Sequence, residues 1–384
     1  MILSNVNSAP FEVFNETVVK FLEDLSTKLL KSPVVRQFPD LSAFAFYIRR
    51  ANLQKLQKDL FLEEGRVGRG LCFHIAPANI PVNFAFSWVF SLLAGNANIV
   101  RLPSKPFPQV DALLAEIDSV IAGYPELKSR NAFVRYPRTD NETTAGYSAI
   151  ADCRMIWGGD RTIAAIRALP SKPRCVDISF ADRYSVAMID GGAVLAANDA
   201  QLSRLAEGFY NDTFLMDQNA CSSPQLILWE HDSAEAREKF WSAIEALARK
   251  KYVLQDALAV DKYTLLCEEA IRGTPIKAVS KICNLIYRLE LGSIPKDPTE
   301  HRGKGGFFFE YSLCDREEFF SKVTEKYQTI TQFGVEVSTL RDQIVSHNLC
   351  GIDRIVPVGQ AMNIGVIWDG HDLVRELSRI INIE

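Results

Sequence analysis

The alternation of short apolar runs with helix-like segments after residue 70 constrains the fold more than any other feature of this sequence. LCFHIAP, ANIVRLPS, NAFVRYP, CRMIWGGD and YSVAMID have the length and apolar content of buried strands, and the segments between most of them have helical patterning. Strands that alternate with helices in this way predict a parallel sheet with crossover helices. We therefore expect a doubly wound α/β domain over residues 63–190.

A second α/β unit is expected after this first domain. Helical patterning in LSRLAEGFY and SAEAREKFWSAIEALARKK alternates with the strand-like runs QLILWE and GGFFFEYSL. The chain has 384 residues, more than a single core normally holds. We predict four segments: N-terminal helices over 1–62, the first α/β domain over 63–190, a second over 191–345, and a C-terminal segment over 346–384. This last segment is expected to return to the first domain or to form an oligomer interface.

Composition and charge narrow the classes of partner. The formal net charge is −4, and no basic block suggests binding to nucleic acid or to an anionic membrane. The most apolar stretch, residues 80–95, is interrupted by Asn83 and is shorter than the roughly 20 residues of a membrane span. The N-terminus lacks the pattern of a secretory signal, and the eight cysteines show no metal-ligand spacing. We expect a cytoplasmic protein with a small-molecule substrate and no metal.

One cysteine differs from the others in its surroundings. Cys221, in QNACSSPQ, lies among small polar residues just before an apolar run, whereas a structural cysteine usually has apolar neighbours on both sides. A polar, partly open site with nearby backbone N–H groups favours the thiolate form. Cys221 is therefore the candidate nucleophile, and the other seven cysteines are interpreted as structural.

Two glycine clusters are weaker candidates for phosphate binding. GRVGRG at 65–70 precedes a strand, where a dinucleotide fingerprint would follow one, so a plain turn is the better interpretation. WGGD at 157–160 follows a strand and opens a helix, where backbone N–H groups can receive a pyrophosphate. Glycine pairs are also common in ordinary loops.

Several motifs in fixed order resemble the aldehyde dehydrogenase superfamily. PANIP at 77–81, AGNANIV at 94–100 and RLPSK at 101–105 are similar to its oxyanion turn, Gly-Asn turn and cofactor strand. A glycine turn at 158–159 and QNAC at 218–221 follow in the same order. QNACSSPQ, RIVPVG and WDG resemble more specifically the LuxC-type fatty acyl-CoA reductases of bacterial bioluminescence and their relatives.

This resemblance implies a Rossmann-type cofactor domain, a second α/β domain with the catalytic cysteine, and roles for individual residues. Cys221 would accept the acyl group, and the Asn79 amide would bind the oxyanion with the N–H of the nucleophile. The basic pair Arg101 and Lys105 stands where NAD-preferring members often carry a glutamate at the second position, which favours NADPH. The implied cofactor-binding residues are Ala76, Pro77, Arg101, Ser104, Lys105, Gly158 and Gly159.

Two departures from the superfamily affect the expected reaction. The stretch at 177–190 contains Asp177 and Asp182 but not the glutamate that activates water in oxidising members. The Glu-x-Phe-Gly-Pro segment that holds the nicotinamide ribose has no clear counterpart. We predict an NADPH-dependent reductase that converts acyl-CoA, or another activated acyl group, to an aldehyde. An aldehyde-oxidising dehydrogenase and a non-reducing acyl-carrying subunit remain alternatives. Expected partners are an acyl-CoA or acyl-protein donor, an acyl-activating synthetase subunit and further copies of the chain.

Overall fold

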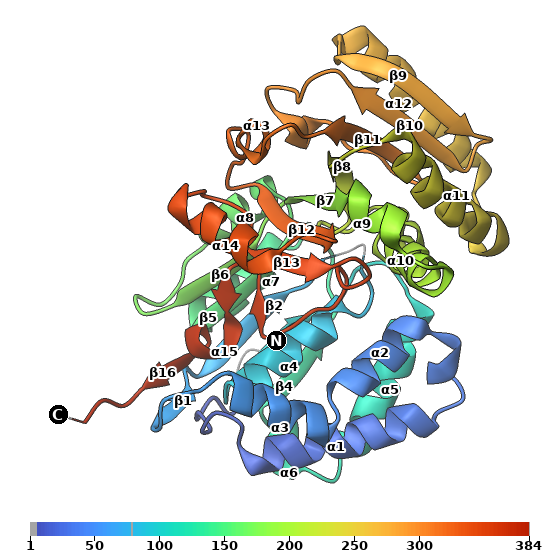
Figure 1. Cartoon of the computed structure of the whole chain (residues 1–384). Helices are drawn as coiled ribbons and strands as arrows, with labels where there is room; N and C mark the ends of the chain where they lie inside the picture. The colour runs from blue at the N-terminus through green and yellow to red at the C-terminus, as the bar shows by residue number, and fades with distance from the viewer. Residues whose placement is uncertain (1–5, 78–79, 384) are drawn as a thin grey trace. The chain divides into compact units, whose positions relative to one another are not determined.

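Two compact units make up the computed structural model, which describes residues 6–77 and 80–383. The described residues up to 181 and from 364 onward form the first unit, and residues 182–363 form the second (Figure 1). The chain thus leaves the first unit at one point and returns to it near its C-terminal end.

The first unit is built on a five-stranded parallel sheet with strand order β4-β3-β2-β5-β6. Its strands are β2 (Leu71–Ile75), β3 (Ala97–Arg101), β4 (Asn131–Val134), β5 (Cys153–Trp157) and β6 (Val176–Phe180). The crossover helices are α4 (Asn83–Leu93), α5 (Pro108–Ile121), α6 (Pro125–Lys128), α7 (Asn141–Ile150) and α8 (Asp160–Arg167). Chain connections run outward in opposite directions from β2 and β5, so these two neighbouring strands form the switch point of a doubly wound sheet.

The N-terminal helices belong to this first unit. They are α1 (Glu16–Lys31), the 3₁₀ turn η1 (Val35–Gln37), α2 (Pro39–Tyr47) and α3 (Arg50–Asp59). Asn15 caps α1 by accepting a hydrogen bond from Thr17 N, with Glu16 in the first turn and lysines in the last. Phe21 and Phe44 from these helices share one apolar core with Trp88 of α4. That core stabilises one face of the sheet.

The C-terminal residues complete the first unit with β14 (Ile367–Trp368), β15 (His371–Asp372), α15 (Leu373–Glu376) and β16 (Ser378–Ile380). Strand β16 pairs antiparallel with β1 (Arg66–Gly68), inside the segment expected to be a plain turn. A Cβ at Gly68 would lie 2.4 Å from Gly95 O, so a glycine is needed where these backbones approach. The prediction of a plain turn over 65–70 is therefore corrected, because residues 66–68 form a short strand of a two-stranded sheet.

The second unit holds a seven-stranded sheet with strand order β13-β12-β7-β8-β11-β10-β9, in which only β9 runs antiparallel to its neighbour among the described pairs. Its strands are β7 (Tyr184–Asp190), β8 (Pro224–Glu230), β9 (Ile276–Ile282), β10 (Ile286–Leu291), β11 (Phe307–Ser312), β12 (Tyr327–Phe333) and β13 (Arg354–Pro357). Its helical elements are α9 (Gly191–Ala196), α10 (Asp199–Asp212), η2 (Phe214–Met216), α11 (Ala234–Lys251), α12 (Asp256–Arg272), η3 (Pro298–Glu300), α13 (Arg316–Phe320) and α14 (Val337–Ser346).

Alternate residues of the central strands serve two separate cores. Val186 and Met188 of β7 face one apolar cluster, whereas Ala187 and Ile189 face the other. This period of two follows from the strand pleat and leaves both faces of the sheet covered.

The expected boundaries at 190/191 and 345/346 differ from those of the two units, 181/182 and 363/364. Strand β7, which we assigned to the first domain, pairs with β8 and β12 and so belongs to the second sheet. Strand β13 pairs with β12 and stays in that sheet as well. Strand pairing decides both boundaries, and the sequence pattern alone does not reveal which sheet a strand joins.

Candidate active site

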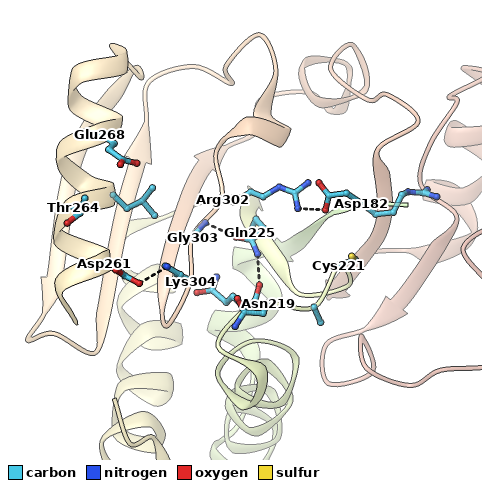
Figure 2. Close-up of a pocket in the computed structure, with 14 residues that line it drawn as sticks. Asp182, Asn219, Cys221, Gln225, Asp261, Thr264, Glu268, Arg302, Gly303 and Lys304 are labelled. Atoms are coloured by element: carbon cyan, nitrogen blue, oxygen red, sulfur yellow. Dashed lines mark hydrogen bonds and ion pairs between the residues drawn. The ribbon is translucent and has the colours of Figure 1, made fainter. Parts of the chain in front are cut away.

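Cys221 lines a cavity of about 400 Å³ in the second unit (Figure 2). The cavity lies where β7, β8 and β11 begin, with helix α12 along one side. Its lining residues are Asp182, Arg183, Gln218, Asn219, Ala220, Cys221, Gln225, Asp261, Thr264, Leu265, Glu268, Arg302, Gly303 and Lys304. Most of these side chains are polar or charged, so the cavity is suited to polar chemistry.

The turn that carries Cys221 is held by the buried side chain of Gln218. Gln218 has a left-handed φ of 59° and is 3% exposed. Its Oε1 accepts hydrogen bonds from the backbone N–H groups of Gly306 and Phe307, at 2.9 and 3.0 Å. Its Nε2 donates to Phe307 O at 3.1 Å. One buried amide therefore ties the cysteine turn to the start of β11.

A second buried amide and a hydroxyl complete this support. Gln225 Nε2 donates to Gln218 O at 3.0 Å, and Gln225 Oε1 accepts from Gly303 N at 2.8 Å. Ser185 Oγ on β7 donates to Cys221 O at 2.7 Å. The Cys221 side chain is exposed, whereas its backbone is anchored from two neighbouring strands. A fixed backbone with an accessible sulfur is the arrangement that a nucleophile requires.

The carboxylates that line the cavity are paired with cations. Among the described lining residues, Asp182 Oδ1 accepts from Arg302 Nη1 at 2.9 Å and Asp261 pairs with Lys304 at 2.6 Å (Figure 2). Glu268 Oε2 lies 3.9 Å from Arg272 Nη2. Of Asp177 and Asp182 in the expected water-activating stretch, only Asp182 lines this cavity.

The other aspartate, Asp177, lies on β6 of the first unit. Its two carboxylate oxygens accept hydrogen bonds from Arg154 Nε and Nη2, both at 2.6 Å. Arg154 is 3% exposed, so this bidentate pair is largely enclosed. Such a pair is a structural element of the sheet.

Helix α12 anchors the cavity wall through two buried charged residues. Lys262 donates hydrogen bonds to the backbone carbonyls of Asn284, Leu285 and Gly305, and burial lowers its pKa to about 8. Burial opposes ionisation of Glu269, but hydrogen bonds from His301 and Thr274 outweigh it and lower the pKa of Glu269. The segment 301–306, which contributes Arg302, Gly303 and Lys304 to the cavity, is therefore fixed at both ends.

The expected cofactor residues lie at the carboxyl edge of the first unit's sheet. Ala76 and Pro77 directly follow β2, and Gly158 and Gly159 directly follow β5. These are the two strands of the switch point, where ligands of doubly wound sheets bind. A Cβ at Gly159 would meet nothing within 4 Å, so open space adjoins the first turn of α8. Asn79 lies outside the described residues.

The basic pair lies at the end of the neighbouring strand. Arg101 is the last residue of β3, and its guanidinium lies 4.6 Å from the centroid of the Tyr136 ring. Ser104 and Lys105 are exposed in the segment that leads to α5. Within the part of the chain that the structure describes, no carboxylate lies within ion-pair distance of Arg101 or Lys105. Both positive charges are therefore available to an anion.

Sequence reasoning missed several residues that the fold brings to these two places. Gln225, Lys262 and Arg302 support or line the Cys221 cavity. Gln225 ends the QNACSSPQ motif but was given no role, and the other two stand in no motif that we singled out. HRGKGG at 301–306, a basic glycine-rich run just before a strand, was the available signal. At the first unit's edge, Arg138 Nη2 donates to Thr162 Oγ1 on α8 at 3.3 Å.

Clusters of metal ligands and long apolar helices are both absent from the part of the chain that the structure describes. No three His, Cys, Asp or Glu side chains there are grouped as metal ligands. None of the helices between residues 6 and 383, apart from the undescribed positions 78–79, combines the length and apolar character of a membrane span.

A comparison with known protein families identifies the family of this chain. Residues 49–262, more than half of the chain, match the family described as "Acyl-CoA reductase (LuxC)". The chain belongs to this family. The match includes β2, β5 and Cys221, so the LuxC resemblance seen in the sequence is confirmed.

Curated proteins that are similar to this chain in sequence include long-chain acyl-protein thioester reductases. The protein from Vibrio harveyi is 26% identical over 327 residues, covering 82% of this chain and 63% of the relative. The protein from Photobacterium phosphoreum is 26% identical over 330 residues, covering 82% and 62%. The chain thus spans somewhat less than two thirds of the length of these relatives.

Solved structures establish the fold. Proline utilization A (PutA) of Bradyrhizobium japonicum matches with a TM-score of 0.65 at 14% identity, covering 94% of this chain and 42% of that one. The glyceraldehyde-3-phosphate dehydrogenase GapN of Methanocaldococcus jannaschii, solved with NADP, matches with a TM-score of 0.63 at 12% identity, covering 95% and 88%. The expected aldehyde dehydrogenase-like α/β fold is confirmed.

Proposed function

We propose that this protein reduces an acyl thioester to an aldehyde with NADPH, through a thioester of the acyl group with Cys221. The observation that carries this proposal is the placement of Cys221. Its side chain is exposed in a polar cavity, while Ser185, Gln218 and Gln225 fix the backbone around it. Membership of the LuxC family supports the same reaction.

The reaction divides into acyl transfer and reduction. The Cys221 sulfur attacks the thioester carbonyl, and the donor thiol leaves with a proton. NADPH, when bound, would supply the hydride that, together with a proton from water, converts the acyl-Cys221 carbonyl to a thiohemiacetal. Collapse of the thiohemiacetal breaks its C–S bond, releases the aldehyde and returns the thiol of Cys221. In this scheme the Asn79 amide binds the oxyanion, a role that stays a prediction from the resemblance.

The first unit offers residues that fit NADPH. Ala76, Pro77, Gly158 and Gly159 flank the switch point, and the open space at Gly159 lets a pyrophosphate approach the first turn of α8. A ribose 2′-phosphate forms strong charge-assisted hydrogen bonds with cations. The positive charges of Arg101 and Lys105 and the hydroxyl group of Ser104 are therefore suited to bind it. GapN, a neighbour in fold, was solved with NADP.

The acyl donor is proposed as an acyl-CoA or an acyl-protein. The family description names acyl-CoA, and the curated relatives are named for acyl-protein thioesters. We also propose an acyl-activating synthetase subunit as a partner, and self-association of the chain.

Acylation without cofactor tests the proposal directly. The protein is incubated with acetyl-, octanoyl- or tetradecanoyl-CoA, and its intact mass is measured. We expect one added acyl group that hydroxylamine removes and that NADPH discharges as aldehyde. Cys221→Ala should abolish both labelling and reduction. Cys314→Ala, which removes another exposed cysteine, should leave both intact.

Each alternative gives a different result. Labelling of Cys221→Ala would contradict the assigned nucleophile. Labelling without any discharge by NADPH would indicate an acyl-carrying subunit. Efficient NADP⁺-dependent oxidation of aldehydes to free acids would indicate an oxidising dehydrogenase.

A further inference from the structure

The proposed function leaves open why the acyl-Cys221 thioester should survive in a cavity that water can enter. Its hydrolysis needs only water and a general base, and a positioned carboxylate acting as general base contributes roughly 10²- to 10⁴-fold. The cavity contains the carboxylates of Asp182, Asp261 and Glu268. The fate of the acyl group therefore depends on what these carboxylates do.

Asp182 is the carboxylate that the chain places beside Cys221. It lies three residues before Ser185, whose hydroxyl donates to Cys221 O at 2.7 Å. Three residues of chain span at most roughly 10 Å, so Asp182 is confined to the surroundings of the nucleophile. Figure 2 shows Asp182 on the Cys221 side of the cavity, whereas Asp261 and Glu268 project from α12 on the opposite side.

Arg302 forms an ion pair with Asp182. Its Nη1 donates to Asp182 Oδ1 at 2.9 Å, its Nε donates to Thr299 O at 3.0 Å, and its guanidinium lies 5.7 Å from the centroid of the Tyr184 ring. A proton moved from water to this carboxylate would replace the ion pair with a weaker hydrogen bond between the guanidinium and a neutral carboxyl group. The pair therefore opposes general-base action by Asp182.

The segment that carries Arg302 is rigidly supported. On one side His301 contacts buried Glu269 at 2.6 Å, and on the other Gly303 N donates to Gln225 at 2.8 Å. Lys262 holds Gly305 O at 2.7 Å. Gln225, which also supports the Cys221 turn, thus helps to hold Arg302 within reach of Asp182, and this favours the ion pair despite its exposure.

We propose that Arg302 is a positioning residue that directs the acyl-enzyme toward reduction by keeping Asp182 in an ion pair. This inference rests on the proposed function. Without the guanidinium, Asp182 accepts a proton from a water molecule as that water attacks the acyl-Cys221 carbonyl. The C–S bond breaks, the proton returns to the Cys221 sulfur, and the products are free carboxylic acid and thiol.

The test measures deacylation of the isolated acyl-enzyme, which separates this step from acylation. Protein labelled with octanoyl-CoA is desalted, and loss of the acyl mass and release of octanoic acid are followed without cofactor. We expect Arg302→Gln to deacylate at least roughly tenfold faster than wild type. Arg302→Lys, which keeps a cation, should stay near the wild-type rate. Arg302→Gln combined with Asp182→Asn should return to that rate, which a merely loosened loop would not do.

Controls address folding and the charge change. The pair between Arg302 and Asp182 is exposed to solvent, and such pairs contribute little to stability, so its loss should leave the fold intact. Arg302→Met, which keeps the aliphatic stem, serves as a second neutral variant. Arg249→Gln, which breaks an exposed pair with Glu245 on α11, should deacylate like wild type.

Three results would overturn the inference. They are wild-type deacylation in both neutral variants, fast deacylation that persists after Asp182→Asn, and equal acceleration in Arg249→Gln. Absence of acyl labelling in wild type would instead contradict the proposed function, so the two failures are distinguishable.

Discussion

At the scale of single residues, local burial and partners separate chemical roles that the residue type alone does not. Cys221 is exposed in a cavity, whereas Cys72 and Cys153 are fully buried on neighbouring strands of the first sheet. Asp177 is enclosed with Arg154, whereas Asp182 lies in the Cys221 cavity with an exposed partner. Two aspartates five positions apart therefore have different surroundings and different possible functions.

Lys105 gives a prediction at this scale. A glutamate there would repel a ribose 2′-phosphate, so Lys105→Glu should reduce or reverse the preference for NADPH over NADH. The preference is measured as the ratio of kcat/KM values for the two cofactors, while cofactor-free acylation of Cys221 should stay unchanged. Lys128→Glu, at another exposed lysine of the first unit, is the matched control. Equal use of NADH and NADPH by wild type would contradict the cofactor assignment.

At the scale of elements, α12 shows that a helix can be anchored by charge. Its fully buried side chains are Lys262 and Glu269, seven residues apart and so on the same face. Both side chains hold the backbone or side chains of the segment before β11. Leu265 and Leu266 also pack against an apolar core, but they are only partly buried, so the most deeply buried side chains of this helix are two satisfied charges.

Lys262 gives a prediction about pH. The pKa of Lys262 is about 8 in the folded protein, below the roughly 10.4 of an unfolded lysine, so the unfolded state binds more protons between these values. The contribution of Lys262 to the free energy of unfolding therefore increases as the pH rises from about 8 to 10. We expect the free energy of unfolding in urea to rise over this range in wild type relative to Lys262→Met.

The Lys262→Met variant should also be less stable than wild type at pH 7, and a second lysine variant serves as the control. Lys262→Met leaves the carbonyls of Asn284, Leu285 and Gly305 without this donor, which should destabilise the protein by about 1–3 kcal/mol at pH 7. Lys250→Met, at an exposed lysine of α11, should reproduce the wild-type pH dependence. An identical pH dependence for Lys262→Met and wild type would contradict the lowered pKa.

At the scale of the whole molecule, each unit carries a different part of the proposed chemistry. The first unit has a switch point with open space at its carboxyl edge, and the basic side chains of Arg101 and Lys105 there have no carboxylate partner among the described residues. The second unit has its Cys221 cavity where β7, β8 and β11 begin, which is the amino edge of its sheet. The usual rule for ligands of doubly wound sheets thus predicts the first site but not the second.

This division predicts two separate patterns of hydrogen exchange. NADP⁺ should slow amide exchange around residues 101–105 and 158–161 in the first unit, because bound phosphates order these backbones. Acylation of Cys221 should slow exchange around residues 217–225 and 301–306 in the second unit. Mass spectrometry of peptides measures both. Protection by NADP⁺ confined to the second unit would contradict the proposed cofactor site.

The sequence by itself determined the fold class, most strands of the first sheet and the identity of the candidate cysteine. These features have local causes: apolar runs of strand length, helical periodicity, and polar neighbours around Cys221. The same local patterns did not reveal α7, α12 or β12, whose sequences carry weaker or mixed signals.

Tertiary structure alone decided which sheet β7 joins, which aspartate reaches the Cys221 cavity, and which buried groups hold the cysteine turn. Each depends on residues far apart in the chain, such as Gln218 with Phe307 or Asp182 with Arg302. Hydrogen-bond donors and acceptors can pair at any sequence separation once the backbone brings them together. Sequence periodicity records only the local burial of each residue and therefore cannot specify these partners.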